Sequence, residues 1–207
     1  MKTAIFAAAL ALSSIGAAQA DSINGLVNTG AAAGLVDSNY TLDSNASYVT
    51  ANDGAFPFPY WSANTATSRW IMPTALQGES FDPSANNTYT WHLGFDLSGY
   101  DAASASFSGR FAADNAATVY LNGHALGTTN GFSDGSWASL SASSYFLSGA
   151  NSLDFVVTNY AQNGGNPTGL RVEFDHSSVT AVPEPETYAM LMAGLLLVGA
   201  VARRRKA

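Results

Sequence analysis

Residues 118–127 read TVYLNGHALG, with a short apolar run on either side of Asn122-Gly123. Both residues of an Asn-Gly pair tolerate positive φ angles, which a tight two-residue turn between antiparallel strands requires. An Asn-Gly pair between two such runs is the strongest short-range signal for a β-hairpin. The stretch therefore predicts a hairpin that turns at Asn122-Gly123, and it places the second half of the chain in a β-sheet.

Three further runs alternate apolar and polar residues with the period of a strand that has one buried face. They are 91–97 (WHLGFDL), 153–158 (LDFVVT) and 170–174 (LRVEF). Clusters of turn-forming residues separate them at 97–101, 130–135, 148–151 and 162–169. No segment between Asp21 and Val179 has a helical period. Short strands joined by polar turns predict an all-β domain, a single β-sandwich.

The order of these segments resembles the jelly-roll sandwich of galactose-binding-like and carbohydrate-binding domains. The resemblance lies in TVYLNGHALG (118–127), FLSGANSLDFVVTN (146–159) and GLRVEF (169–174), and it covers about residues 89 to 175. It implies a jelly-roll fold and does not select a ligand, because one fold carries many functions.

Charge distribution excludes one class of partner. All fifteen acidic residues lie between Asp21 and Glu186, together with only Arg69, Arg110 and Arg171. Three positive and fifteen negative charges give this stretch a net charge of −12. Such a surface repels a phosphate backbone, so we expect no nucleic-acid partner. The chain has no cysteine, which excludes disulfides and thiol chemistry.

The N-terminal segment has the parts of a secretory signal peptide. Lys2 supplies a positive start, an apolar run follows, and Ala18-Gln19-Ala20 is an A-x-A cleavage pattern. We therefore expect a signal helix in residues 1–20, cleavage between Ala20 and Asp21, and export of the remainder.

The C-terminus combines a Pro183-Glu184-Pro185 tripeptide, fifteen uncharged residues from Tyr188 to Ala202, and an arginine-rich end. A helix over those fifteen residues is about 22 Å long. That is short for a permanent membrane span, which usually needs about 20 residues. Positive charges after a span hold that end in the cytoplasm. The two prolines are expected to keep the tripeptide extended and outside the helix.

These three parts, in this order, resemble the PEP-CTERM sorting signal. The resemblance implies that a membrane-embedded exosortase recognises Pro183, Glu184 and Pro185 and removes the helix. It also implies delivery to the cell surface or to an extracellular polysaccharide matrix, after transient membrane anchoring. The expected domains are thus a signal peptide (1–20), a β-sandwich (21–180) and a sorting signal with a transmembrane helix (181–207).

An aromatic cluster at residues 56–61 (FPFPYW), followed by Trp70, is the best candidate for ligand binding. Sugars lay their apolar C–H faces on such rings, and Tyr60, Trp61 and Trp70 are the residues expected to bind. The prolines keep this piece out of a central strand. The alternative is that the rings cap one end of the core. If the cluster has neither role, the loops around Asp114, Asn115 and 163–166 are the next candidates.

Other chemical patterns are weak. Ser133, Asp154 and His176 follow the chain order of an α/β-hydrolase triad, but Ser133 lacks the strand-to-helix context of a nucleophile elbow. His92, His124 and His176 have no metal-ligand spacing. The segment that starts at Asp43 lacks the glycine and glutamate of an EF-hand. We expect no cofactor; a structural calcium, with ligands that the sequence does not identify, is the alternative.

The sequence therefore predicts a non-enzymatic, exported protein with a structural or adhesive role. A carbohydrate-binding module for matrix polysaccharide is the alternative, and a glycan-active enzyme is the third reading. No acidic pair stands out as the two carboxylates that a glycosidase needs.

Overall fold

The computed structural model describes residues 20–183 and 185–204. The β-strands are β1 (Ala20–Asp21), β2 (Val36–Leu42), β3 (Asn45–Val49), β4 (Ile71–Met72), β5 (Asn87–Asp96), β6 (Tyr100–Leu121), β7 (His124–Gly131), β8 (Ala138–Ala142), β9 (Ala150–Asn159) and β10 (Gly169–Ala181). A short 3₁₀ turn, η1 (Asp134–Ser136), follows β7, and the helix α2 (Pro185–Arg204) follows β10. The predicted all-β class is confirmed.

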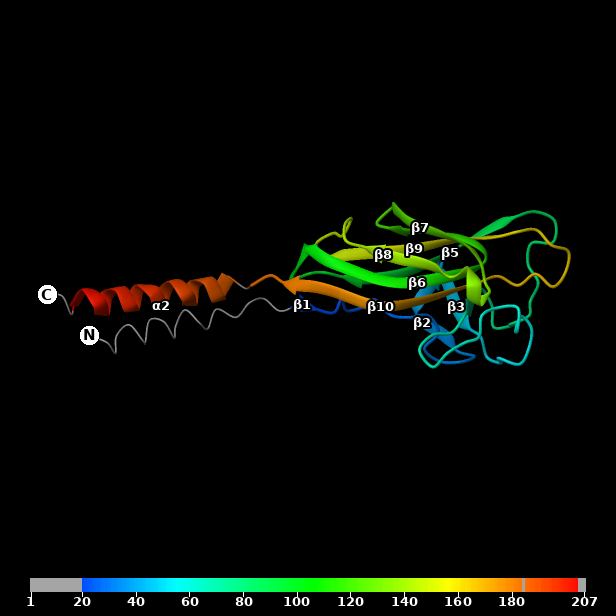
Figure 1. Ribbon diagram of the computed structural model, residues 1–207, viewed down its shortest axis with the longest axis horizontal. Coiled ribbons are helices and arrows are strands. Elements are labelled where there is room, and N and C mark those ends of the chain that lie inside the picture. The colour runs from blue at the N-terminus through cyan, green and yellow to red at the C-terminus, as the bar shows by residue number, and fades with distance from the viewer. Residues whose placement is uncertain (1–19, 184, 205–207) are drawn as a thin grey trace.

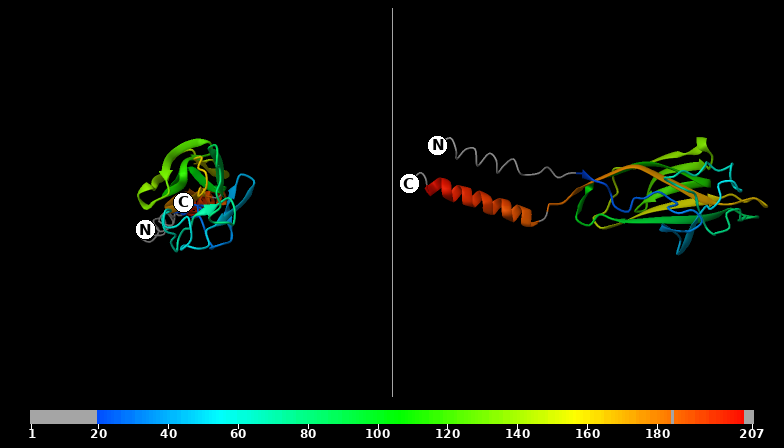
Figure 2. Two further views of the ribbon diagram at one scale, coloured as in Figure 1. Left: turned by 90° about the vertical axis from the view of Figure 1, so that its right-hand side faces the viewer. Right: turned by 90° about the horizontal axis from the view of Figure 1, so that it is seen from below.

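The strands form one continuous set of antiparallel pairings. Their order is β10-β4-β3-β2-β5-β9-β6, and β6 also pairs with β10, so the two layers join and the ring of pairings closes. β1 extends this set along β10, while β7 and β8 pair with β6. The long strands β5, β6, β9 and β10 run along the long axis of the molecule (Figures 1 and 2).

The core confirms the predicted alternation. Trp91, Leu93 and Phe95 on one face of β5, and Leu97 directly after it, are all buried as expected. On β9, Leu153, Phe155 and Val157 are fully buried and belong to the same apolar cluster. From β10 the cluster receives Leu170 and Val172. Period-2 patterning therefore identified the apolar core faces of these strands, although on β10 the intervening residues Arg171 and Glu173 are buried as well.

The hairpin predicted at Asn122-Gly123 is present. Leu121 pairs with His124 across the turn, and the φ angles of Asn122 and Gly123 are +49° and +83°. The Asn122 side chain also holds the neighbouring strand. It donates to Oδ1 of Asn151 at 2.8 Å and accepts from the backbone N–H of Ser152 at 3.0 Å.

Several strands lack a clear signal in the sequence. The first part of β6 alternates alanine with serine, so the two faces differ little in hydrophobicity even though Ala105 and Ala113 are buried. In β2 the pattern is reversed, because Val36 is exposed while Asp37 is buried. The Asp37 carboxylate accepts three backbone N–H groups, from Gly30, Asn39 and Tyr40. These bonds compensate for burying its charge.

The two ends of the sandwich differ. β1 pairs with the last residues of β10, through Ala20 with Thr180 and Asp21 with Val179, so the expected cleavage point lies beside the start of the sorting signal. α2 extends from this end, and the long loops 50–82 and 160–168 gather at the opposite end (Figure 1). Residues 1–19 of the expected signal helix (1–20) and Glu184 of the sorting tripeptide lie outside the described residues.

One expectation about the sorting tripeptide is wrong. Pro185 does not stay outside the helix but is the first residue of α2. Proline is tolerated there because the first N–H of a helix has no intrahelical acceptor. No helix in the described part of the chain combines the length and the apolar character needed to cross a membrane.

Candidate functional site

Asp114 and Asn115 lie where β6 changes partners. Asp114 forms the last pairing of this stretch of β6 with Gly169 of β10, and Ala116 forms the first pairing with Thr158 of β9. The register of β6 with β7 also shifts between Ala113 and Ala116. A bulge of this kind bends a strand and redirects its side chains. Here it brings Asp114 and Asn115 to a pocket at the loop end of the sandwich.

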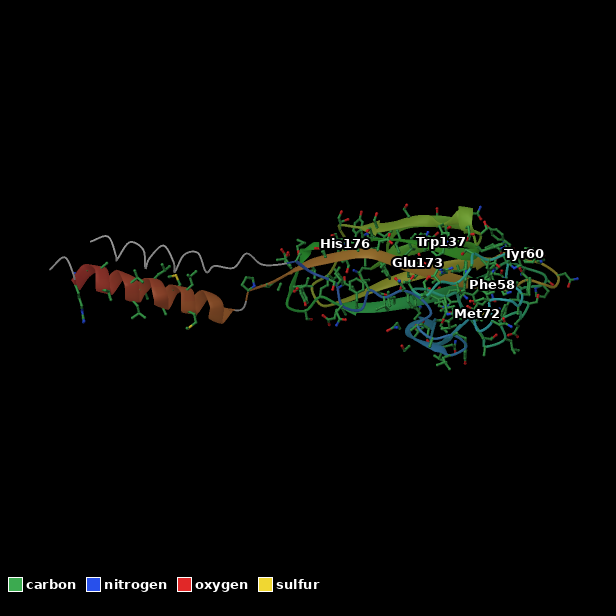
Figure 3. All side chains as sticks on the ribbon, turned by 60° about the horizontal axis from the view of Figure 1, so that its bottom comes forward. Phe58, Tyr60, Met72, Trp137, Glu173 and His176 are labelled. Atoms are coloured by element: carbon green, nitrogen blue, oxygen red, sulfur yellow. The ribbon has the colours of Figure 1, made fainter. Side chains whose placement is uncertain are left out.

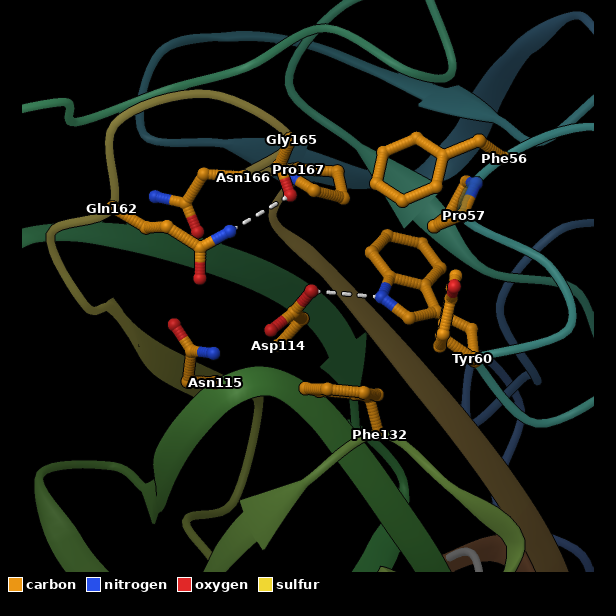
Figure 4. Close-up of a pocket in the computed structure, with 11 residues that line it drawn as sticks. Phe56, Pro57, Tyr60, Asp114, Asn115, Phe132, Gln162, Gly165, Asn166 and Pro167 are labelled. Carbon is orange, nitrogen blue, oxygen red and sulfur yellow. Dashed lines mark hydrogen bonds between the residues drawn. The ribbon is translucent and has the colours of Figure 1, made fainter.

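This pocket has a volume of about 300 Å³. Three segments beyond the β6 bulge supply its walls: the aromatic loop, the turn after β7, and the loop between β9 and β10. The lining residues are Phe56, Pro57, Tyr60, Trp61, Asp114, Asn115, Phe132, Gln162, Gly165, Asn166 and Pro167 (Figure 4). The site thus combines aromatic rings, amides and one carboxylate, and it lies at the end of the molecule that carries Tyr60 and Phe58 (Figure 3).

The Asp114 carboxylate is the most unusual group in the pocket. Asp114 is 5 % exposed, and its Oδ2 accepts a 2.8 Å hydrogen bond from Nε1 of Trp61 (Figure 4). Its Oδ1 has no hydrogen-bond partner among the described residues. Burial raises the pKa of Asp114 to about 7, and the bond from Trp61 offsets only part of that rise. An unpaired buried oxygen is costly, so it is a candidate contact for a ligand.

Trp61 and Trp70 do not form the exposed platform that the sequence suggested. Their exposed fractions are 2 % and 0 %, and their rings are tilted by 38° at a centroid distance of 4.5 Å. They belong to a second apolar cluster with Phe58, Met72 and Ala112. Trp70 is therefore buried in the core and has no surface for a sugar. Trp61 borders the pocket with little exposed area, while Tyr60 is 67 % exposed.

A buried arginine on β10 explains why this loop packs so closely. Arg171 is 1 % exposed and donates to the carbonyl oxygens of Ser62 and Ala63. It also donates to Oγ of Ser68 at 2.7 Å and to Oε1 of Glu173 at 3.0 Å. Burial lowers the pKa of Arg171, although the charge of Glu173 opposes this effect. These hydrogen bonds hold the 61–70 loop against β10, and the indole rings of Trp61 and Trp70 in this loop are buried.

Glu173 balances that buried charge. It accepts from Ser68 at 2.6 Å and from Nε of Arg110 at 2.7 Å. Burial alone would raise the pKa of Glu173, but the hydrogen bonds from Ser68 and Arg110 and the charge of Arg171 outweigh it and lower the pKa. The guanidinium groups of Arg110 and Arg171 both lie over the Trp137 ring, at 4.4 and 5.0 Å. This network of Arg110, Arg171, Glu173 and Trp137 supports the loop that carries the aromatic side of the site.

The amides of the pocket are partly occupied by loop contacts. Oδ1 of Asn115 accepts from the Tyr160 N–H at 2.7 Å, which leaves its NH₂ group without a partner in the described structure. The side-chain NH₂ group of Gln162 donates to the carbonyl oxygen of Gly164 at 3.0 Å. The side-chain oxygen of Gln162 has no hydrogen-bond partner among the described residues. Asn166 is buried and ties its loop to Phe81 through its NH₂ group. Asn115 and Gln162 thus offer one donor group and one acceptor to a ligand.

The sequence pointed to part of this site. It named the aromatic cluster and, as the next candidates, the loops around Asp114, Asn115 and 163–166, which the structure places together. It missed Phe132 and Gln162. Their signal in the sequence is weak, because each lies in a cluster of turn-forming residues that indicates only a connection between strands.

The hydrolase-like pattern does not form a site. The His92 ring contacts Oδ1 of Asp154 at 2.8 Å, and Ser133 contacts Ser136, so Ser133, Asp154 and His176 do not make a triad. Asp43, with a φ angle of +49°, lies in the turn between β2 and β3. Within residues 20–183 and 185–204, no three acidic or histidine side chains are grouped so that they could hold a metal ion.

Comparison with known proteins identifies the C-terminal segment of the chain. Among the described residues, the ten strands and the C-terminal helix α2 define an all-β domain that is followed by a single helix. Residues 181–206 match the PEP-CTERM protein-sorting motif, as the tripeptide and the arginine cluster had predicted. The chain therefore carries a PEP-CTERM signal, which marks an exported protein processed by an exosortase. No match was found among curated proteins.

Solved structures similar to this chain include carbohydrate-binding modules. A family 35 module from an environmental isolate is 17 % identical, with 54 % of this chain and 82 % of that chain covered and a TM-score of 0.26. The module CsCBM6-3 from Clostridium stercorarium, in complex with cellobiose, is also 17 % identical, with 71 % and 98 % covered and a TM-score of 0.29. Scores this low carry no argument about a ligand.

Proposed function

We propose that this protein is an exosortase-sorted surface protein whose β-sandwich binds a carbohydrate in the pocket beside Asp114. The observation that carries the proposal is the buried, unpaired Oδ1 of Asp114, a residue that lines a pocket together with the exposed rings of Phe56 and Tyr60. Carbohydrates need both kinds of contact, because their hydroxyl groups seek hydrogen bonds and their C–H faces lie on rings. Small-molecule sites in general combine apolar walls with a few placed polar groups.

The position of the pocket supports a role at the cell surface. It lies at the end of the sandwich opposite to α2, so a protein held through its sorting signal presents the pocket outward (Figure 1). We propose that α2 anchors the chain in the membrane transiently. After exosortase cleavage the sandwich would remain at the cell surface or enter an extracellular polysaccharide matrix.

The test is binding of the full chain, in mild detergent, to a glycan array and to polysaccharide from the producing cells. Tyr60→Ala removes an exposed ring at the pocket and should weaken retention at least tenfold without lowering the melting temperature. Tyr145→Ala is a matched control, because Tyr145 is 50 % exposed and does not line the pocket. Equal retention of the wild type and Tyr60→Ala would contradict the proposal.

A structural or adhesive role without a specific sugar is the second candidate. It is favoured by the burial of Trp61 and Trp70, which removes two of the three rings expected to bind. We propose that the chain is not an enzyme in either case. In support, Asp114 is the one carboxylate that lines the described pocket, whereas glycoside hydrolysis normally uses two.

A further inference from the structure

We infer that the pocket beside Asp114 takes an uncharged sugar residue and rejects uronic acids and sulfated sugars. This inference rests on the proposed function and adds the chemical class of the ligand. It follows from three features of the described residues: the charges that line the pocket, the partners of the basic side chains, and the geometry around Asp114.

First, the pocket offers nothing to neutralise an anion. Its lining residues include one carboxylate and no lysine, arginine or histidine among the residues that the structure describes. Proteins recognise carboxylates and sulfates through charge-assisted hydrogen bonds, above all from arginine. An anionic sugar would lose hydration here and gain no opposite charge in return.

Second, the three arginines of the sandwich are engaged elsewhere. Arg69 pairs with Asp53 at 3.1 Å, while Arg110 and Arg171 both pair with Glu173, at 2.6 and 3.0 Å. Arg171 is also almost fully buried. Moving Arg171 toward a ligand would leave a buried charge unpaired, which is strongly unfavourable.

Third, the Asp114 carboxylate, which carries its charge above about pH 7, then repels an anion but suits a hydroxyl group. A hydroxyl can donate to the unpaired Oδ1, and the NH₂ group of Asn115 and the side-chain oxygen of Gln162 lie around the same space (Figure 4). A second carboxylate in this pocket would lie a few ångströms from Asp114. Like charges at such distances disfavour each other strongly where water is excluded.

Size limits the ligand as well. A volume of about 300 Å³ is at the lower end of the range for small-molecule sites, about 300 to 1,000 Å³. The site therefore suits one sugar residue or the end of a chain, with Tyr60 and Phe56 at its apolar side. Exposed fractions of 67 % and 40 % leave both of these rings accessible.

The experiment compares matched neutral and acidic sugars on the full chain by calorimetry at pH 8, where Asp114 is ionised, and at one salt concentration. The pairs are methyl glucoside with methyl glucuronide and methyl galactoside with methyl galacturonide. We expect at least one neutral sugar to bind at least tenfold more tightly than its acidic partner. An acidic sugar that binds as well or better would overturn the inference and leave carbohydrate binding intact. If none of the four binds, the pocket does not take a single neutral hexose and the inference fails, whereas the glycan array and the polysaccharide test decide the proposed function separately.

A positive charge added at the rim tests the cause. Gln162 is exposed at the edge of the pocket, so Gln162→Arg should fold normally and supply the missing cation. It should reduce the preference for the neutral sugar by at least tenfold. Thr128→Arg adds the same charge at an exposed position of β7 outside the pocket and should leave the preference unchanged. An equal effect of both variants would show that overall charge, and not the pocket, sets the preference, and would overturn the inference.

Discussion

The indole Nε1 of Trp61 donates a 2.8 Å hydrogen bond to Oδ2 of Asp114, and both residues are buried. The bond joins the aromatic loop to the corner of β6, two segments that lie 53 residues apart in the chain. It fixes the direction of the carboxylate and leaves Oδ1 without a hydrogen-bond partner among the described residues. Packing of the loop and presentation of the candidate ligand group therefore depend on the same side chain.

Trp61→Ala should lower the free energy of unfolding by about 3 to 5 kcal/mol, the usual range for a buried aromatic truncated to alanine. Denaturant unfolding measures this change. Trp61→Phe is the matched control, because it keeps an apolar ring and removes only the N–H donor. It should cost less stability than Trp61→Ala and should still weaken sugar binding. A Trp61→Ala protein as stable as the wild type would contradict the burial of this ring.

Stability should fall as pH rises from about 4 to about 7, because of Asp114. Its ordinary pKa of 3.8 is raised to about 7 in the folded state. Between these values the folded state binds a proton that the unfolded state has released, so each step up in pH favours unfolding. The loss is complete above about pH 7, where the buried carboxylate carries its charge. Thermal unfolding measured between pH 4 and 8 checks this slope.

Asp114→Asn isolates that contribution. The amide oxygen can still accept from Trp61, but the side chain no longer ionises, so the slope between pH 4 and 7 should flatten. Glu173, whose pKa is lowered, acts in the opposite direction and at lower pH, where its stabilising charge is lost. We expect Asp114→Asn to be at least as stable as the wild type at pH 8 and to bind sugar less well. An unchanged slope would show that Asp114 does not titrate as described.

Gly169→Ala should disturb the site through packing. A Cβ atom there would lie 2.5 Å from Cη2 of Trp61 and 2.9 Å from the carbonyl oxygen of Ile71. The Trp61 ring must then move, at a cost of about 1 to 3 kcal/mol, as for other overpacked core positions. Sugar binding should weaken together with stability, because the same ring holds Asp114. A Gly169→Ala protein that is destabilised but binds sugar with wild-type affinity would contradict the prediction, because it would show that the position of the Trp61 ring affects packing and not binding.

Gly123→Val should destabilise the chain through the backbone alone. No heavy atom lies within 4 Å of a Cβ built at Gly123, but its φ is +83°. A left-handed conformation costs a residue with a Cβ about 1 to 2 kcal/mol. Gly135→Val is the control, since Gly135 also has open space and has no positive φ. Chemical denaturation of the two variants should show a loss for Gly123→Val and a smaller change for Gly135→Val.

The extracellular form should begin at Asp21 and lack the sorting helix. Residues 181–206 match the PEP-CTERM motif, and the A-x-A pattern ends at Ala20. Intact-mass measurement of secreted or surface-released protein should therefore give a chain that ends within or near residues 183–186. Replacement of Pro183 and Pro185 by alanine should retain the unprocessed form in the membrane fraction. A secreted mass that includes Ala207 would contradict exosortase processing.

Local patterning in the sequence was enough for part of this architecture. Alternation along β5, β9 and β10 and the Asn122-Gly123 turn are short-range features, and they predicted the all-β class and the inward faces of these strands. The sorting signal could also be identified from the sequence, because it is a short linear motif whose parts are adjacent in the chain. The first part of β6 was not readable, since alternating alanine and serine leave little contrast between its two faces.

The tertiary structure alone decided which aromatic rings are accessible. Nothing in the sequence FPFPYW distinguishes Tyr60, which is 67 % exposed, from Trp61, which is 2 % exposed. That difference arises because Arg171, more than 100 residues later in the chain, holds the loop against β10. In the same way, Asp114 has its unusual pKa because the fold removes water from it and provides one hydrogen bond for two oxygens. Strand patterns are local and can be read in sequence, whereas burial depends on contacts between distant segments.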